Sequence, residues 1–182
     1  MEKIFYNKIP LGFNKKHMPT FDTQKYSCNV IISENCKEYL LNIIYNLTNK
    51  YENKIYIEIQ GDDEQLRNII NDINLNEYNH VPMRSIGFLK YSLGILQFYS
   101  NKKYVLEYIV SLWDSELFLR LSHFVTNEAD LSFDKSFAGN FIKTVNNSDV
   151  IITQSGDGDE IEIVFRKSFD FNSLIFNENS VR

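Results

Sequence analysis

The sequence predicts one α+β (or α/β) domain over residues 1–182, with a mixed β-sheet, about three helices packed on it and a C-terminal β-hairpin. The first supporting observation is hydrophobic spacing, which is helical in some segments and alternating in others. The second is the low content of 7 Gly and 3 Pro, which argues against long linkers. The third is length, because a chain of this size buries roughly 70% of its unfolded surface.

The most apolar sustained stretch is 101–125, which contains the only tryptophan, Trp113. Polar residues recur every three or four positions in its first half, which predicts an amphipathic helix over 102–113. Leucines then alternate with other residues, which favours a strand over 116–125. A helix starting at Asp114 fits the same positions. We expect this stretch to be the scaffold on which the rest packs.

Earlier in the chain, strands are expected at 3–9 and 28–32, where β-branched and aromatic residues are frequent. Ser33 follows as a helix N-cap, since its hydroxyl can accept a hydrogen bond from an unpaired backbone amide. The apolar positions after it recur at helical spacing and predict a helix to about Asn49.

Residues 54–60, KIYIEIQ, alternate cleanly and predict a strand that Gly61 ends. Asp62, with Gln65 three residues later, resembles a capping box and predicts the start of a second helix. The order strand, helix, strand, helix over 28–75 is βαβ-like. It suggests two parallel strands joined by a right-handed crossover.

A loop is expected over 80–84 around Pro82. A hairpin is expected next, in which 85–90 pairs with 95–99 across a turn containing Gly94.

Residues 126–148 are polar and predict irregular chain with a short helix near 137–145. The C-terminal hairpin pairs 150–154 with 160–166, because the glycines of the connecting SGDGD segment allow the positive φ of a tight turn.

The net charge of −5 is unevenly distributed. Residues 34–79 carry nine acidic side chains against four basic ones, and residues 126–182 carry ten against five. Such a surface disfavours nonspecific nucleic-acid binding, in which Lys and Arg must neutralise phosphates. It suits a basic protein partner, which long-range attraction would steer towards it.

Three features predict a soluble protein of the cytoplasm with no membrane partner. No run approaches the roughly 18 uninterrupted apolar residues of a membrane span. The opening segment MEKIFYNKIPLGFNKK lacks the apolar block and cleavage site of a signal peptide. Cys28 and Cys36 are too few for a disulfide framework and have apolar neighbours, as buried thiols do.

No motif for cofactor or metal chemistry is present. Neither GxGxxG nor GxxxxGK[ST] occurs, so both standard glycine-rich phosphate loops are missing. His17, His80 and His123 lack the spacing of zinc ligands, which number three or four in a protein site. We therefore expect no catalytic residue, no cofactor and no metal.

Two clusters of carboxylates remain, and both have structural explanations: helix capping for the first and a hairpin turn for the second. Acidic residues in such places can also contact a basic partner. The candidate partner-binding residues are Asp62, Asp63, Glu64, Asp157, Asp159 and Glu160.

A small, acidic, aromatic-rich cytoplasmic domain of this kind resembles the immunity proteins of bacterial toxin systems, including contact-dependent growth inhibition. The resemblance lies in the character of the whole chain, and no motif transfers a residue role. It implies a stoichiometric inhibitor whose acidic patches complement a basic cognate toxin domain, commonly a nuclease.

Two other functions stay open on the sequence. One is a small enzyme whose site is assembled from scattered residues, with His80 or His123 beside a carboxylate such as Asp114 or Glu116. The other is a structural subunit of a homo-oligomer, and the sequence leaves the oligomeric state open.

Overall fold

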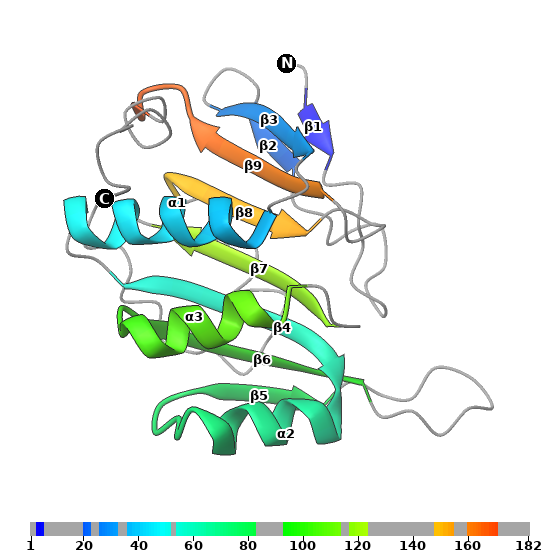
Figure 1. Ribbon diagram of the computed structural model, residues 1–182. Helices are drawn as coiled ribbons and strands as arrows, with labels where there is room; N and C mark the ends of the chain where they lie inside the picture. The colour runs from blue at the N-terminus through cyan, green and yellow to red at the C-terminus, as the bar shows by residue number, and fades with distance from the viewer. Residues whose placement is uncertain are drawn as a thin grey trace.

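The computed structural model describes residues 3–5, 20–22, 26–32, 36–51, 54–82, 93–113, 117–123, 148–154 and 160–170. These residues form three helices and nine strands (Figure 1). The helices are α1 (Cys36–Tyr51), α2 (Asp63–Asp72) and α3 (Lys103–Ser111). The strands are β1 (Lys3–Phe5), β2 (Thr20–Asp22), β3 (Tyr26–Ile32), β4 (Ile55–Asp62), β5 (Asn79–Pro82), β6 (Leu93–Ser100), β7 (Phe118–His123), β8 (Val150–Gln154) and β9 (Glu160–Arg166).

Seven of these strands form one sheet in the order β3-β9-β8-β7-β4-β6-β5, and β1 pairs with β2 separately. Every pair of neighbours is antiparallel. The α+β class is confirmed, as are the helices packed on the sheet and the C-terminal hairpin, which is β8 and β9.

The expected parallel pair, and with it the mixed sheet, is wrong. Strands β3 and β4 do run in the same direction, but β9, β8 and β7 lie between them. These three strands come from the C-terminal half of the chain, so the local order of elements over 28–75 could not reveal their insertion. The connection through α1 spans all three, with α1 itself in front of β8 (Figure 1), and the described sheet is antiparallel throughout.

Each helix connects two strands that point the same way without being neighbours. Helix α1 joins β3 to β4, α2 joins β4 to β5, and α3 joins β6 to β7. Strands β6 and β7, which α3 connects, run opposite to β3, β4 and β5. The α3 connection also moves across the sheet towards β3, whereas the α1 and α2 connections move towards β5. Crossovers of one hand therefore bring all three helices to one face, as Figure 1 shows.

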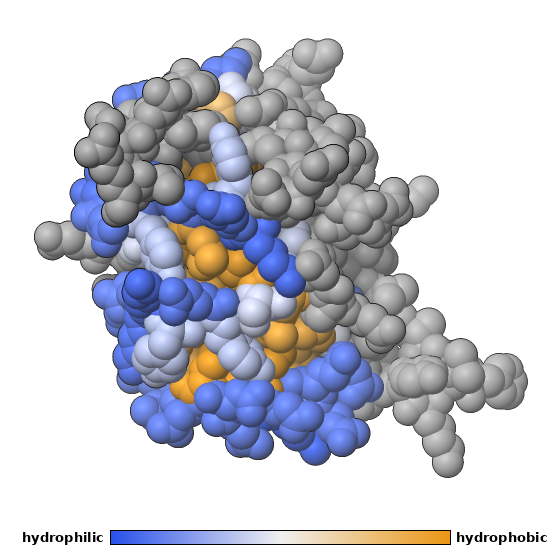
Figure 2. Space-filling view, viewed as in Figure 1, coloured by the Kyte–Doolittle hydropathy of each residue, from blue (hydrophilic) through white to orange (hydrophobic). Residues whose placement is uncertain are grey.

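The core lies between this helical face and the sheet. It includes Trp113, Leu119 and Leu121, each at most 1% exposed, which confirms the scaffold role for the described parts of this stretch, 101–113 and 117–123. The predicted helix is α3, and the strand alternative after it is confirmed by β7. Hydrophilic side chains cover the outer surfaces of the helices, and apolar residues show between them (Figure 2).

Two glycines lie inside strands, where turns or breaks were expected. Strand β4 continues through Gly61, which stands opposite Gly94 of β6. A side chain at Gly61 would meet Leu117, so this glycine permits close packing rather than a break. The turn predicted at Gly94 is therefore wrong.

The loop predicted around Pro82 is also wrong, because residues 79–82 form β5 and pair with β6. Pro82 ends this edge strand, where a missing backbone N–H costs little pairing. Other expectations lie outside the described residues: the Ser33 cap, the strand at 85–90, the short helix near 137–145 and the 155–159 turn.

Hydrogen bonds between side chains join the helices on their outer surface. The Tyr45 hydroxyl donates to Glu107 Oε1 at 2.7 Å, linking α1 to α3, and the Tyr108 hydroxyl donates to Asp72 Oδ2 at 2.6 Å, linking α3 to α2. Partial burial, followed by the hydrogen bond and charge of each carboxylate, raises the pKa of both tyrosines to about 12.

Candidate functional site

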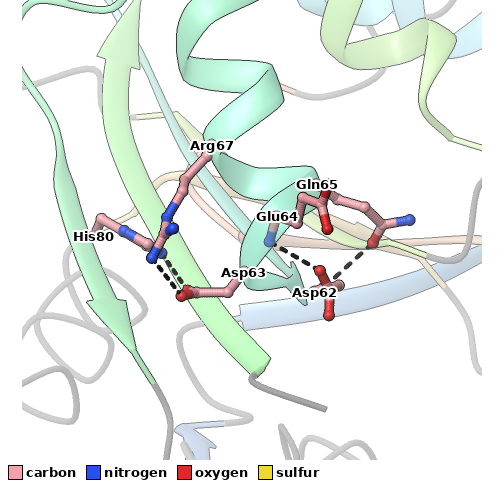
Figure 3. A network of polar contacts seen from close by, with 6 residues as sticks. All are labelled: Asp62, Asp63, Glu64, Gln65, Arg67 and His80. Atoms are coloured by element: carbon pink, nitrogen blue, oxygen red, sulfur yellow. Dashed lines mark hydrogen bonds and ion pairs between the residues drawn. The ribbon is translucent and has the colours of Figure 1, made fainter. Parts of the chain in front are cut away.

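The first acidic cluster lies where β4 ends and α2 begins. The carboxylate of Asp62 accepts a hydrogen bond from the backbone N–H of Glu64 at 2.8 Å, and the Asp62 N–H donates to Gln65 Oε1 at 3.3 Å (Figure 3). The predicted capping box is therefore confirmed. Asp62 is half-buried and Glu64 is exposed.

Asp63 has a different environment and is only 8% exposed. Its Oδ1 lies 2.7 Å from His80 Nε2, and its Oδ2 lies 3.2 Å from Arg67 Nη2 (Figure 3). A carboxylate withdrawn from water needs such partners, because burying an unpaired charge is costly. The structure thus gives Asp63 a structural role, in which it ties α2 to the edge strand β5.

Gly94 makes room for this pair. A Cβ at this position would lie 2.6 Å from Asp63 Oδ1 and 3.0 Å from His80 Nε2. Both distances are tighter than ordinary van der Waals contact. Helix α2 and strands β5 and β6 meet here only because residue 94 has no side chain.

The second acidic cluster is only partly described. Asp157 and Asp159 lie outside the described residues, whereas Glu160 begins β9 opposite Ile32 of β3, and nothing is described of its side chain. Strands β9 and β4 run in opposite directions. The start of β9 and the end of β4 therefore lie at the same end of the sheet (Figure 1).

The topology thus brings Glu160 to the end of the sheet that holds Asp62 and Glu64. Strands β7 and β8 lie between β4 and β9, so three strand spacings, about 14 Å, separate β4 from β9. We call this end of the sheet, where β4 ends at Asp62 and is followed by Glu64, and where Glu160 begins β9, the acidic end. The two clusters are separate in sequence and near each other in the fold.

A polar network that the sequence did not predict lies on the sheet face away from the helices. Gln97 Nε2 donates to Glu58 Oε2 at 3.0 Å, and Asn79 Nδ2 donates to Gln97 Oε1 at 2.8 Å. Tyr56 makes a longer contact, with its hydroxyl 3.4 Å from Glu58 Oε2. Glu58 is 5% exposed and Gln97 is fully buried.

Strand alternation places Glu58 opposite the isoleucines of β4, which is the one signal for this network in the sequence. Alternation alone does not show whether the face that carries Glu58 is buried or exposed. The pairing of Glu58 with Gln97 depends on the β4–β6 register, which the sequence did not disclose.

Among the described residues, no group of three or more His, Cys, Asp or Glu side chains could hold a metal ion. The structure pairs His80 with Asp63. Asp114 and Glu116 lie outside the described residues. His123 ends β7, and nothing is described of its side chain.

No family model, curated protein or solved structure matches the chain. Within the described part of the chain, no helix has both the length and the apolar character to cross a membrane.

Proposed function

We propose that this protein is an immunity protein that acts in the cytoplasm, where it binds a cognate basic toxin domain and neutralises it stoichiometrically. The supporting observation is the acidic end, since Asp62 and Glu64 lie at the same end of the sheet at which Glu160 begins β9. A nuclease is the favoured class of toxin, because its substrate-binding surface must be positive to hold phosphates.

The size of the acidic end suits such an interface. A standard interface buries about 800 Å² on each partner, so one partner domain can span the strand ends at β4 and β9, about 14 Å apart. Charge complementarity of this kind raises association rates more than it lowers dissociation rates. The acidic end is therefore expected to guide encounter.

Tyr39 supplies a candidate anchor at the same end. It lies in the first turn of α1 and is 37% exposed. Helix α1 follows β3, whose last residue pairs with Glu160, so α1 begins at the acidic end. Exposed tyrosines frequently dominate binding energy, because a rigid ring buries much area at low entropic cost.

The first test is whether the gene directly upstream encodes a large secreted protein with a variable C-terminal domain, and the second uses that domain as the partner. The two proteins should form a 1:1 complex in light scattering, and co-expression should protect cells from that domain. Absence of such a gene, of a complex or of protection would contradict the proposal.

The interface is tested by measuring association rates at low salt. The variant Asp62→Asn/Glu64→Gln/Glu160→Gln removes charge while keeping a good N-cap, because Asn caps about as well as Asp. We expect association to slow by about tenfold. Asp170→Asn is the matched control, since exposed Asp170 lies just beyond β9, at the other end of the sheet. An unchanged association rate would remove these carboxylates from the interface.

The anchor is tested by dissociation. Tyr39→Ala should raise the dissociation rate by at least about tenfold while changing the association rate little. Tyr104→Ala serves as the control, because Tyr104 is 53% exposed and lies at the opposite end of the sheet. Equal effects of the two variants would refute the assignment of Tyr39.

The pair of His80 and Asp63 favours a second candidate, a small enzyme. A carboxylate that orients an imidazole occurs in many hydrolytic sites, and the His80 side chain keeps 18% of its surface exposed. His80→Asn distinguishes the two functions. An inhibitor should keep toxin binding, whereas an enzyme that uses His80 as a base should lose turnover.

A further inference from the structure

A cavity of about 240 Å³ lies at the end of the sheet opposite the acidic end. It is open to solvent on one side and is lined by the start of β4, the segment after α2, and the junction of β6 with α3. Typical sites for drug-sized ligands measure about 300 to 1,000 Å³, so this cavity admits a smaller molecule.

The polar lining of the cavity favours an anion. Lys54 and Lys102 line it, are exposed, and form no ion pair with any residue that the structure describes. Glu77 is the one acidic residue among the described lining residues. The amino end of α3, where Lys102 occupies the N-cap without a side-chain cap, adds positive potential of the same sign.

The rest of the lining suits a small organic group. Leu75 and Tyr99 line the cavity and are half-buried, so each keeps accessible apolar surface. Tyr104 also lines the cavity and is 53% exposed, so its ring is accessible to a ligand. Charge and apolar surface thus occur in one open hollow.

We propose that this cavity binds a small phosphate monoester, with the phosphate held by Lys54 and Lys102 and its organic group against Leu75, Tyr99 and Tyr104. A phosphate monoester carries between −1.5 and −2 charges near neutral pH, which two ammonium groups can balance. Lysine is a common phosphate ligand, acting as a point charge. The site does not depend on the function proposed for the acidic end.

Binding is tested on the full chain by two-dimensional ¹H–¹⁵N NMR in a phosphate-free buffer of constant ionic strength. Phenyl phosphate should produce saturable shifts of the amides at 74–77 and 101–105. Inorganic phosphate should bind the same residues more weakly, because it lacks the ring. Phenol at equal concentration should bind more weakly than phenyl phosphate, because it lacks the charge.

The variant Lys54→Gln/Lys102→Gln should weaken phenyl phosphate binding by about tenfold or more, because it removes both ion pairs. Lys103→Gln is the matched control, because Lys103 follows Lys102 directly and does not line the cavity. Its ammonium lies 3.8 Å from Glu107 instead. The control should change affinity less than twofold, and Glu77→Gln should strengthen binding.

Each opposite result overturns the proposal. Shifts that grow without saturation, or that spread over lysines throughout the protein, would mean nonspecific charge screening. If Lys103→Gln weakened phenyl phosphate binding as much as Lys54→Gln/Lys102→Gln does, binding would also be nonspecific. Urea midpoints of all variants should stay near that of the unmodified protein, because substitutions at exposed positions change stability by about 0.5 kcal/mol or less.

Discussion

Replacing Gly94 with alanine should destabilise the protein by about 2 kcal/mol. The added methyl would lie 2.6 Å from Asp63 Oδ1, 3.0 Å from His80 Nε2 and 3.0 Å from Leu66 Cδ1. The carboxylate cannot retreat freely, because His80 and Arg67 hold it from two sides. Either the ion pair opens or β6 moves away from α2.

The magnitude combines two opposing effects. Overpacking a buried site costs about 1 to 3 kcal/mol, and contact with three atoms at once favours the upper value. Alanine returns up to about 1 kcal/mol, because glycine loses more backbone entropy on folding. With a urea dependence of about 2 kcal/mol per molar, the net loss lowers the unfolding midpoint by about 1 M.

A double-mutant cycle measured by urea unfolding identifies the cause. Asp63→Ala removes the nearest atom, so Gly94→Ala should cost at least about 1 kcal/mol less in that background. Gly61→Ala is the matched control, because its cross-strand position is directly opposite and its added methyl meets Leu117 instead. Equal costs of Gly94→Ala with and without Asp63 would refute the steric argument.

Three further changes test the described contacts. Asp62→Ala should lower stability by about 1 kcal/mol and Asp62→Asn by much less, as measured by urea unfolding; equal losses would contradict the capping role. Gln97→Leu should lower the free energy of unfolding by about 2 to 3 kcal/mol, because it removes a hydrogen-bond donor from buried Glu58. A loss below about 0.5 kcal/mol, the size expected for a surface substitution, would contradict the role of this hydrogen bond. The pKa of Tyr45 and Tyr108 is raised to about 12, so the folded state keeps protons that the unfolded state releases above about pH 10. The free energy of unfolding that these two tyrosines contribute is therefore fully present below about pH 10 and is lost as the pH rises towards 12. Urea unfolding at about pH 9 to 12 should show a shallower loss of stability in the variant Tyr45→Phe/Tyr108→Phe.

Local spacing predicted what depends on neighbours in the sequence. The capping box at Asp62 needed only Gln65 three residues later, and the scaffold helix needed only the spacing of its polar face. Such interactions form within one turn, so the sequence carries all the information they require.

The contacts that define the site depend on distant segments. His80 reaches Asp63 only because 79–82 forms a strand, and Pro82 suggested a loop there. The burial of Glu58 likewise depends on Gln97 of β6, which stands opposite it in register. The sheet order was hidden for the same reason, since β7, β8 and β9 insert between strands that follow each other in the chain.

The net charge of a sequence segment differs from the charge of a surface. Residues 34–79 carry nine acidic side chains, but Glu58 and Asp63 are buried, and Asp72 lies at the far end of α2, bonded to Tyr108. Fewer carboxylates are therefore available for steering at the acidic end than the block suggested. With few exposed charges, electrostatic attraction can speed encounter but supplies little of the affinity, because exposed pairs are each worth about 1 kcal/mol or less. A tight complex through this end would have to draw its affinity from desolvated contacts. Among the described residues, Tyr39 is an exposed aromatic residue placed to make one.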